Sequence, residues 1–206
     1  MEALGPLREV RSWDQAVRRQ DTEAALRAAI MATIGERGFA KATVKELAER
    51  TGLGGDRFHR RFHGKQAAFA WAYEEGAERL YGDLLDACQG AATWRAGFEA
   101  AVASLLGFVA AEPAVAKALL VEVRAARGDA WEKHQELTER LIDILDSARH
   151  EPGARPSATV TTSGFVLGAI EETLCIELAA GRGADVERLL PDLTHLAFLQ
   201  LFGEGD

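Results

Sequence analysis

The sequence predicts an all-α fold, and three observations support this. Apolar residues recur at steps of three and four along almost the whole chain of 206 residues. No stretch shows the period of two that a half-buried strand would show. Glycine and proline punctuate the periodic segments, most clearly in the loop at 151–156. We therefore expect about nine helices and enough chain to bury a core.

Three regions are expected along the chain. Residues 1–20 are poorly periodic and predict a flexible arm. Residues 21–66 predict three short helices, and residues 67–206 a larger helical bundle. Ser157 should cap the penultimate helix, and Pro191 should begin or bend the last one. The expected helices cover about 21–38, 43–51, 55–62, 65–85, 94–111, 113–126, 129–150, 158–180 and 185–202.

Composition indicates a cytoplasmic protein without membrane contact. Hydrophobic residues make up 48% and charged residues 27% of the chain, which is ordinary for a globular protein. No apolar run approaches the ~20 residues needed to span a bilayer, and residues 1–21 lack the apolar core of a signal peptide. Cys88 and Cys175 lie far apart within helical patterns, so we expect reduced thiols.

The charge is unevenly distributed. The net charge of −8 argues at first against a nucleic-acid partner. Residues 1–65, however, hold 13 Lys and Arg against 9 Asp and Glu, whereas residues 66–206 hold 11 against 23. A basic N-terminal part on an acidic remainder suggests that only the N-terminal part meets a polyanion.

Residues 43–62 have the build of a helix-turn-helix. Thr43 and Glu46 form the pattern of a capping box, in which each side chain pairs with the other residue's backbone amide. Gly52 permits a tight left-handed turn between the two short helices. Two helices joined in this way are typical of DNA-binding domains.

The second of these helices has an outward face suited to DNA. Phe58 and Phe62 stand four residues apart and are expected to face the core. The side chains opposite them then point outward or flank that face, and Arg can donate two hydrogen bonds to guanine. The residues of this face are Asp56, Arg57, His59 and Arg60.

Residues 22–69 resemble the N-terminal domain of the TetR/AcrR family. The matching residues are Gly38-Phe39, Thr43-Val44, Leu47-Ala48, Thr51-Gly52-Leu53, Phe58, Phe62 and Lys65. The resemblance implies a dimeric one-component transcriptional regulator, with double-stranded operator DNA and a small-molecule effector as partners. It further implies backbone contacts by Thr43, Lys45, His59 and Lys65, and base contacts by Gly55, Arg57 and Arg60.

The sequence departs from this family in the turn and the second helix. Gly54 stands where a small capping residue such as Ser is usual, and Asp56-Arg57-Phe58-His59 stand where Gly-Thr-Leu-Tyr is usual. The operator sequence therefore cannot be transferred from relatives. These departures motivate an alternative, in which the protein is an all-helical small-molecule-binding or scaffold protein whose helix-turn-helix no longer binds DNA.

No motif predicts catalysis, a cofactor or a metal. The chain has no GxSxG, P-loop, HExxH or CxxC pattern, so we expect no enzyme and name no catalytic residue. His59 and His63 are four apart, but no third ligand lies near them. The leading hypothesis is a repressor that leaves its operator when a small molecule binds its helical body.

Aromatic and acidic residues of the body are candidates for the ligand site. They are Trp94, Phe98, Phe108, Glu122, Trp131, Phe165 and Glu171. A buried carboxylate must be paired or hydrated, so a cationic or amine-bearing apolar ligand could pair with Glu122 or Glu171. In the alternative, these glutamates face solvent or pair with Arg across a dimer, and the aromatic residues are ordinary core.

Segments 158–180 and 185–202 are candidates for a homodimer interface. They carry more apolar surface than one small bundle needs to bury, and isologous contact is the commonest way to cover such surface. The expected interface residues are Phe165, Leu167, Leu174, Leu193, Leu196 and Leu199.

Overall fold

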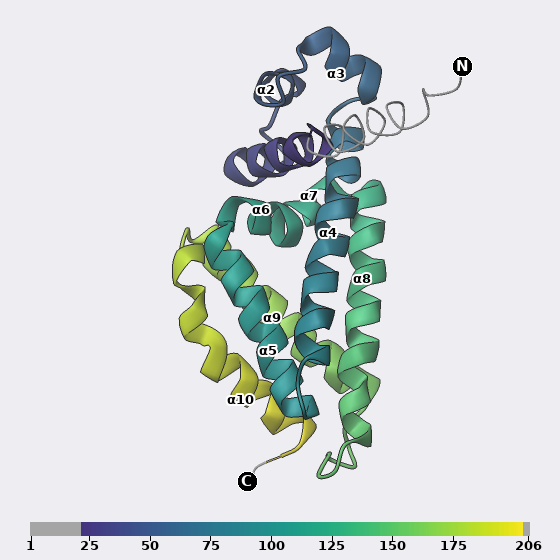
Figure 1. Ribbon diagram of the computed structural model, residues 1–206, viewed down its shortest axis with the longest axis vertical. Helices are drawn as coiled ribbons and strands as arrows, with labels where there is room; N and C mark the ends of the chain where they lie inside the picture. Colours follow the sequence, from purple (N-terminus) through teal and green to yellow (C-terminus); the bar gives the residue numbers. More distant parts are fainter. Residues whose placement is uncertain (1–21, 204–206) are drawn as a thin grey trace, which may run out of the picture.

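The computed structural model describes residues 22–203, and every regular element in this range is a helix (Figure 1). The all-α prediction is confirmed. The proposed arm at 1–20 lies outside the described residues. Three short helices form a head at one end of the molecule, and the longer helices form an elongated body beneath it.

The head contains a helix over residues 22–37, followed by α2 (Val44–Arg50) and α3 (Gly55–Arg61). The predicted capping box of α2 is present. The Thr43 amide donates to Glu46 Oε2 (2.9 Å), and the Glu46 amide donates to Thr43 Oγ1 (3.2 Å). These two bonds pair amides that a helix start otherwise leaves without partners.

The head is held together by the apolar faces that the sequence predicts. Glycines at the ends of the first two helices, Gly38 (φ 80°) and Gly52 (φ 67°), adopt the left-handed conformation that reverses the chain. The inward stripes of the three helices meet in one buried cluster that extends into the body. Its members in the head include Ile30, Ile34, Phe39, Leu47, Phe58 and Phe62.

The body is built around α4 (Lys65–Gln89), which runs from the head through the length of the molecule (Figure 1). It packs against α5 (Trp94–Ala111) and α8 (Gly128–Asp146), and α9 (Val160–Ala179) packs against α8. The last helix, α10 (Leu190–Leu201), lies against α5 and α9. Because α4 belongs to both regions, the core is not divided at the predicted boundary after residue 66.

Beneath the head, the predicted helix at 113–126 is present but irregular. It consists of α6 (Pro113–Lys117), a π-helical turn (Ala118–Glu122) and α7 (Val123–Ala126) in direct succession. A π-helical turn is wider than an α-turn, is rare, and occurs often at functional sites. We call Ala118–Glu122 the π-turn.

The beginnings of the last two helices differ in part from the prediction. Thr159, not Ser157, takes the N-cap position of α9, and its amide donates to Thr162 Oγ1 (3.1 Å). Pro191 lies in the first turn of α10, as predicted, where its missing amide proton costs nothing. Short 3-10 turns complete the described chain at Ser147–His150 and Gly183–Leu189.

Among the described helices, α5 alone is long and apolar enough to cross a membrane by length and composition. It packs against α4 on one side and α10 on another. Core helices of helical bundles share this composition, so the feature is weak evidence for a membrane span.

Candidate nucleic-acid interface and cavity

The outward face of α3 is basic and open. Arg57, His59 and Arg60 are exposed, and none of them forms an ion pair with another described residue. At the start of the helix, nothing lies within 4 Å of the position that a side chain on Gly55 would occupy. The face therefore presents free donors and a surface that another molecule's backbone can approach closely.

The orientation of this face is fixed from behind. Phe58 is fully buried, and its ring lies 5.1 Å from that of Phe62. Arg61 turns back toward the core edge, where it pairs with Glu23 (3.2 Å) and lies over the Trp71 ring (4.9 Å). The predicted inward and outward faces of α3 are confirmed.

The two residues at the start of α2 that are predicted to contact the DNA backbone, Thr43 and Lys45, differ in how free their side chains are. The Lys45 side chain is 86% exposed and only distantly paired with Glu49 (4.0 Å). The Thr43 hydroxyl is occupied within the capping box, where it also donates to Glu46 Oε2 (3.0 Å). Lys45 is thus free to meet a phosphate, whereas Thr43 would have to share its hydroxyl.

Lys65 has a structural role that the sequence analysis missed. It is the first residue of α4, and its ammonium group donates to the carbonyl oxygens of Phe39, Ala42 (2.9 Å) and Ala40 (3.5 Å). An ammonium group has three donors, and three carbonyls lie in reach. While these contacts hold, no donor remains for the expected DNA backbone contact.

Glu122 joins the same loop from the opposite side. Its Oε2 accepts a hydrogen bond from the Phe39 amide (2.7 Å), and its carboxylate lies beside Gly38. The expected role of Glu122 in a ligand site is not supported, because it does not line the cavity described below. Its partner is the head: the loop at 38–42 is held by Glu122 and Lys65 together.

A second contact brings the head and the body close together. Gly35, in the first helix, packs directly on Ala114 of α6, and a Cβ at Gly35 would meet the Ala114 carbonyl oxygen at 1.7 Å. Any larger side chain at Gly35 would push the two helices apart. The head is therefore seated on the segment from α6 to the π-turn.

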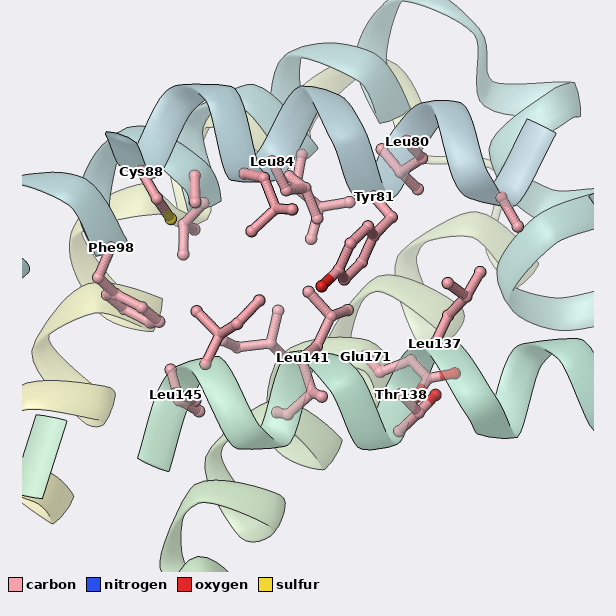
Figure 2. Close-up of a pocket in the computed structure, with 18 of the residues that line it drawn as sticks. Leu80, Tyr81, Leu84, Cys88, Phe98, Leu137, Thr138, Leu141, Leu145 and Glu171 are labelled. Atoms are coloured by element: carbon pink, nitrogen blue, oxygen red, sulfur yellow. The ribbon is translucent and has the colours of Figure 1, made fainter. Parts of the chain in front are cut away.

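The body encloses a cavity of about 380 Å³ between α4, α5, α8, α9 and the π-turn. Figure 2 shows apolar side chains from α4 and α8 facing each other across it, with the Tyr81 ring projecting into the space between them. The volume is typical of sites for small organic ligands. Its lining includes Leu80, Leu84, Ala101, Val102, Leu105, Leu119, Leu120, Leu141, Ile144 and Leu145.

Three of the seven predicted ligand residues line this cavity: Trp94, Phe98 and Glu171. Besides Glu122, the other three are placed elsewhere. Phe108 fills the junction of the two core clusters, and Trp131 stacks on His134 at 5.0 Å. Phe165 is 61% exposed on the outer face of α9. Helical periodicity identified these as apolar positions but did not say which face of the bundle each would meet.

A polar network lies at the end of the cavity near the head. The Tyr73 hydroxyl lies 3.0 Å from His134 Nδ1, and His134 Nε2 lies 3.1 Å from Glu171 Oε1. Arg124 pairs with Glu171 (3.2 Å) and also with Glu172 (3.0 Å). Burial raises the pKa of Tyr73, so its hydroxyl stays protonated.

The charge state of Glu171 follows from these contacts. Burial raises the pKa of Glu171, but the interactions with His134 and Arg124 lower it by more than burial raises it. The net pKa therefore lies below the usual value. Oε1 lacks a well-directed hydrogen bond even though both partners lie near it. Arg124 and His134 still stabilise the ionised form from these short distances, because attraction between charges depends little on angle. Glu171 is an ionised, compensated carboxylate.

The sequence analysis did not identify Tyr73 and His134. The sequence feature that could have indicated them is a hydrogen-bonding side chain within an apolar stripe, Tyr73 on α4 and His134 on α8. The network also reaches the π-turn, since Tyr73 Oη lies 3.4 Å from the Leu119 carbonyl oxygen. Cys175, a free thiol like Cys88, donates to the Leu120 carbonyl (3.4 Å). Tyr73, which lines the cavity, thus also contacts a carbonyl group of the π-turn.

The predicted interface residues separate into two groups. Leu174 and Leu193 are buried within a single chain, and Leu167 lines the cavity, so these three are core residues and not free interface residues. Phe165 is exposed on α9, as is Ile176 (56%). Leu196 and Leu199 on α10 keep partial exposure.

Residues 26–70 match the family model for bacterial regulatory proteins of the tetR family. The match covers the first helix, the helix-turn-helix and the beginning of α4. By this N-terminal domain, the chain is similar to the TetR family. No curated protein sequence matches it significantly.

Solved structures of low sequence identity share the TetR fold over most of the chain. FadR from Bacillus subtilis, in complex with stearoyl-CoA, has a TM-score of 0.73 at 16% identity, covering 89% of this chain and 99% of that chain. The fatty acid degradation regulator FadR from Bacillus halodurans has a TM-score of 0.72 at 16% identity, with coverages of 85% and 96%. The ketosteroid transcriptional regulator KstR2 of Mycobacterium tuberculosis has a TM-score of 0.65 at 15% identity, covering 87% of this chain and 94% of that chain.

The open basic face predicts base-specific contacts by Arg57 and Arg60. Replacing either with Ala should weaken binding to a preferred DNA sequence by about 1–3 kcal/mol and relax discrimination at particular base pairs. Competition binding with single-base variants of that sequence measures this. Equal losses for every DNA sequence would contradict the assignment of these residues to the bases.

The contacts of Lys65 predict a loss of stability in Lys65→Met. Up to three carbonyl groups lose their charged partner, which should cost about 1–3 kcal/mol of unfolding free energy. Denaturant unfolding measures this, and Lys45→Met, exposed in the same domain, should stay within about 0.5 kcal/mol of the wild type. DNA affinity measured against salt separates the two roles of Lys65: a slope lowered by about one unit would show a phosphate contact instead.

Proposed function

We propose that this protein is a dimeric, ligand-responsive transcriptional repressor, which leaves its operator when a small molecule enters the cavity. One observation carries the proposal. The π-turn lines the cavity with Leu119 and Leu120 and ends at Glu122, which holds the Phe39 amide of the head. A change in the cavity wall therefore has a direct path to the DNA-binding domain.

DNA binding by the head is supported by its charge and geometry. The exposed donors of α3 lie opposite its buried phenylalanines, and α2 adds the exposed Lys45. Two recognition helices in a dimer must lie about 34–36 Å apart to enter successive major grooves. The acidic charge of the rest of the chain favours an orientation in which only the head faces the phosphates.

The π-turn is suited to having two arrangements. Its wide geometry relies on partners outside the helix, because Tyr73 and Cys175 lie within reach of the carbonyls of Leu119 and Leu120. A ligand that displaces Tyr73, which lines the cavity, would favour a regular α-turn, and the residues that follow would rotate about the helix axis. Glu122 would then move away from Phe39, and the head would lose the position that the 38–42 loop gives it.

An apolar stripe on α9 supports a homodimer. Phe165 and Ile176 are eleven residues apart, close to three full helical turns, so they share one exposed face. Partly exposed leucines of α10 lie on the adjoining helix. An apolar surface of this kind is typical of an isologous interface.

The direct test of DNA binding is selection of sequences from a random duplex pool, followed by affinity measurements over a salt series. Enrichment of a near-palindromic sequence, with affinity that falls as salt rises, supports a regulator. If the protein enriches no sequence, it would instead be a small-molecule-binding or scaffold protein whose helix-turn-helix no longer binds DNA. The residues Gly54, Asp56 and His59 raise this alternative.

The bond between Glu122 and Phe39 predicts the effect of Glu122→Ala. A hydrogen bond to a charged group contributes about 1.5–3 kcal/mol, and its loss should free the head. We expect faster amide exchange at Phe39 and operator affinity weakened by about tenfold, with the body unaffected. Glu112→Ala, an exposed glutamate on the same segment, is the matched control. Unchanged exchange and affinity in Glu122→Ala would contradict a role in coupling.

The stripe on α9 predicts that Phe165→Glu or Ile176→Glu will produce monomers. Each places a charge in an interface that would otherwise bury an apolar side chain. Sedimentation at micromolar concentration should show a dimer for the wild type and for Gln135→Glu, an exposed control on α8. Dimers that persist in both α9 variants would place the interface elsewhere.

A further inference from the structure

We infer that the cavity binds an elongated, uncharged and largely apolar molecule, whose single hydrogen-bonding group lies at the end formed by Tyr73, His134 and Glu171. This inference rests on the proposed function and names the chemical class of the effector. It is carried by the shape of the cavity, the distribution of polar groups along its wall, and the charge balance at its inner end.

The cavity is long relative to its volume. Its lining on α4 extends from Tyr73 to Gln89, and on α8 from His134 to Leu145. At the rise of an α-helix, these stretches correspond to about 24 Å and about 17 Å. A volume of about 380 Å³ spread along this length favours a molecule that is extended rather than globular.

Apart from the hydroxyl of Tyr81, whose ring projects into the space between α4 and α8, polar groups lie toward the two ends of the cavity. Gln89 and Ser147 are exposed and mark the opening far from the head, where Trp94 Nε1 donates to Ser147 Oγ (3.2 Å). At the inner end, Glu171 and Thr138 both line the cavity, and Figure 2 labels them. The wall between them is mostly aliphatic and aromatic, so the ligand must be apolar over most of its length.

The inner end offers hydrogen bonding but no uncompensated charge. Glu171 is the carboxylate that lines the cavity, and it is already paired with Arg124 and His134. A ligand ammonium group would find no free anion there, and a ligand carboxylate would face Glu171. Because an unpaired charge in an apolar cavity is strongly unfavourable, a hydroxyl or an amide fits this end best.

This inference differs from the expectation of a cationic ligand. That expectation assumed that Glu122 and Glu171 needed an external partner. The structure provides internal partners for both, the Phe39 amide for Glu122 and Arg124 for Glu171. The alternative of pairing with Arg is thus realised for Glu171, although within the chain rather than across a dimer.

The test compares three probes with the same alkyl chain: 1-decanol, decylamine and sodium decanoate, each below its micelle concentration. Binding to the full-length protein without DNA is measured by calorimetry and thermal shift. We expect 1-decanol to bind at least tenfold more tightly than either charged probe. Ala101→Phe, which fills the cavity, should abolish this binding, and that result excludes attachment to an outer surface.

Variants of two adjacent glutamates test the charge balance. Glu171→Gln should shift the preference toward decanoate, because Arg124 then loses one of its two carboxylate partners and a ligand carboxylate in the cavity could take its place. Glu172→Gln is the matched control, since Glu172 pairs with the same arginine but is 59% exposed and does not line the cavity. It should leave the order of the three probes unchanged.

The outcomes separate this inference from the proposed function. Tightest binding by decylamine, lost in Glu171→Gln, would overturn the inference in favour of a cationic ligand. Tightest binding by decanoate, or no binding by 1-decanol, would also overturn it. Binding of 1-decanol that leaves operator affinity unchanged would support the inference about the cavity and count against the proposed mechanism of release.

Discussion

The placement of the head depends on how the peptide groups of residues 38–42 are paired. This loop lies between two helices, and backbone groups that are sheltered from water need partners from elsewhere in the molecule. The body supplies them from two sides: Lys65 donates to carbonyl oxygens of the loop, and Glu122 accepts from the Phe39 amide. A positive charge at the start of α4 is itself unfavourable for the helix dipole. The carbonyl oxygens around Lys65 offset that cost, so the helix and the loop stabilise each other.

The segment beneath the head serves two surfaces at once. One side of the π-turn forms cavity wall, and its last residue holds the head. The close approach of Gly35 to Ala114 adds a contact without room for adjustment. This segment thus meets the head through one tight packing contact, at Gly35, and one charged hydrogen bond, at Glu122. If the hydrogen bond breaks, this arrangement favours rotation of the head about Gly35 over separation of the head from the body.

Much of the head could be predicted from the sequence because its determinants are local. Capping residues, left-handed glycines and the four-residue spacing of Phe58 and Phe62 all act within a few residues, and each is present as expected. The cavity could not be predicted in this way. Periodicity shows that Phe108 and Trp131 are apolar, but which neighbours they meet depends on the packing of helices far apart in the chain. The same limit explains why Leu174 and Leu193, expected at an interface, are core residues. It also explains why the carbonyl partners of Lys65 were not predicted: they lie more than twenty residues earlier in the chain.

The π-turn gives this region an unusual sensitivity to chain length. A π-helical turn accommodates one residue more than an α-turn over the same rise. Deleting a single residue within Ala118–Glu122 would therefore restore regular geometry with little change in helix length. The helix beyond the deletion would keep its direction and its rotation about the helix axis, because the wide turn already absorbs the extra residue. Without the deletion, regular α geometry over the same residues would turn everything that follows by about 100°. The possibility of that rotation is thus encoded by the number of residues in this turn as much as by their identity, and a chain with one residue fewer here would lack it.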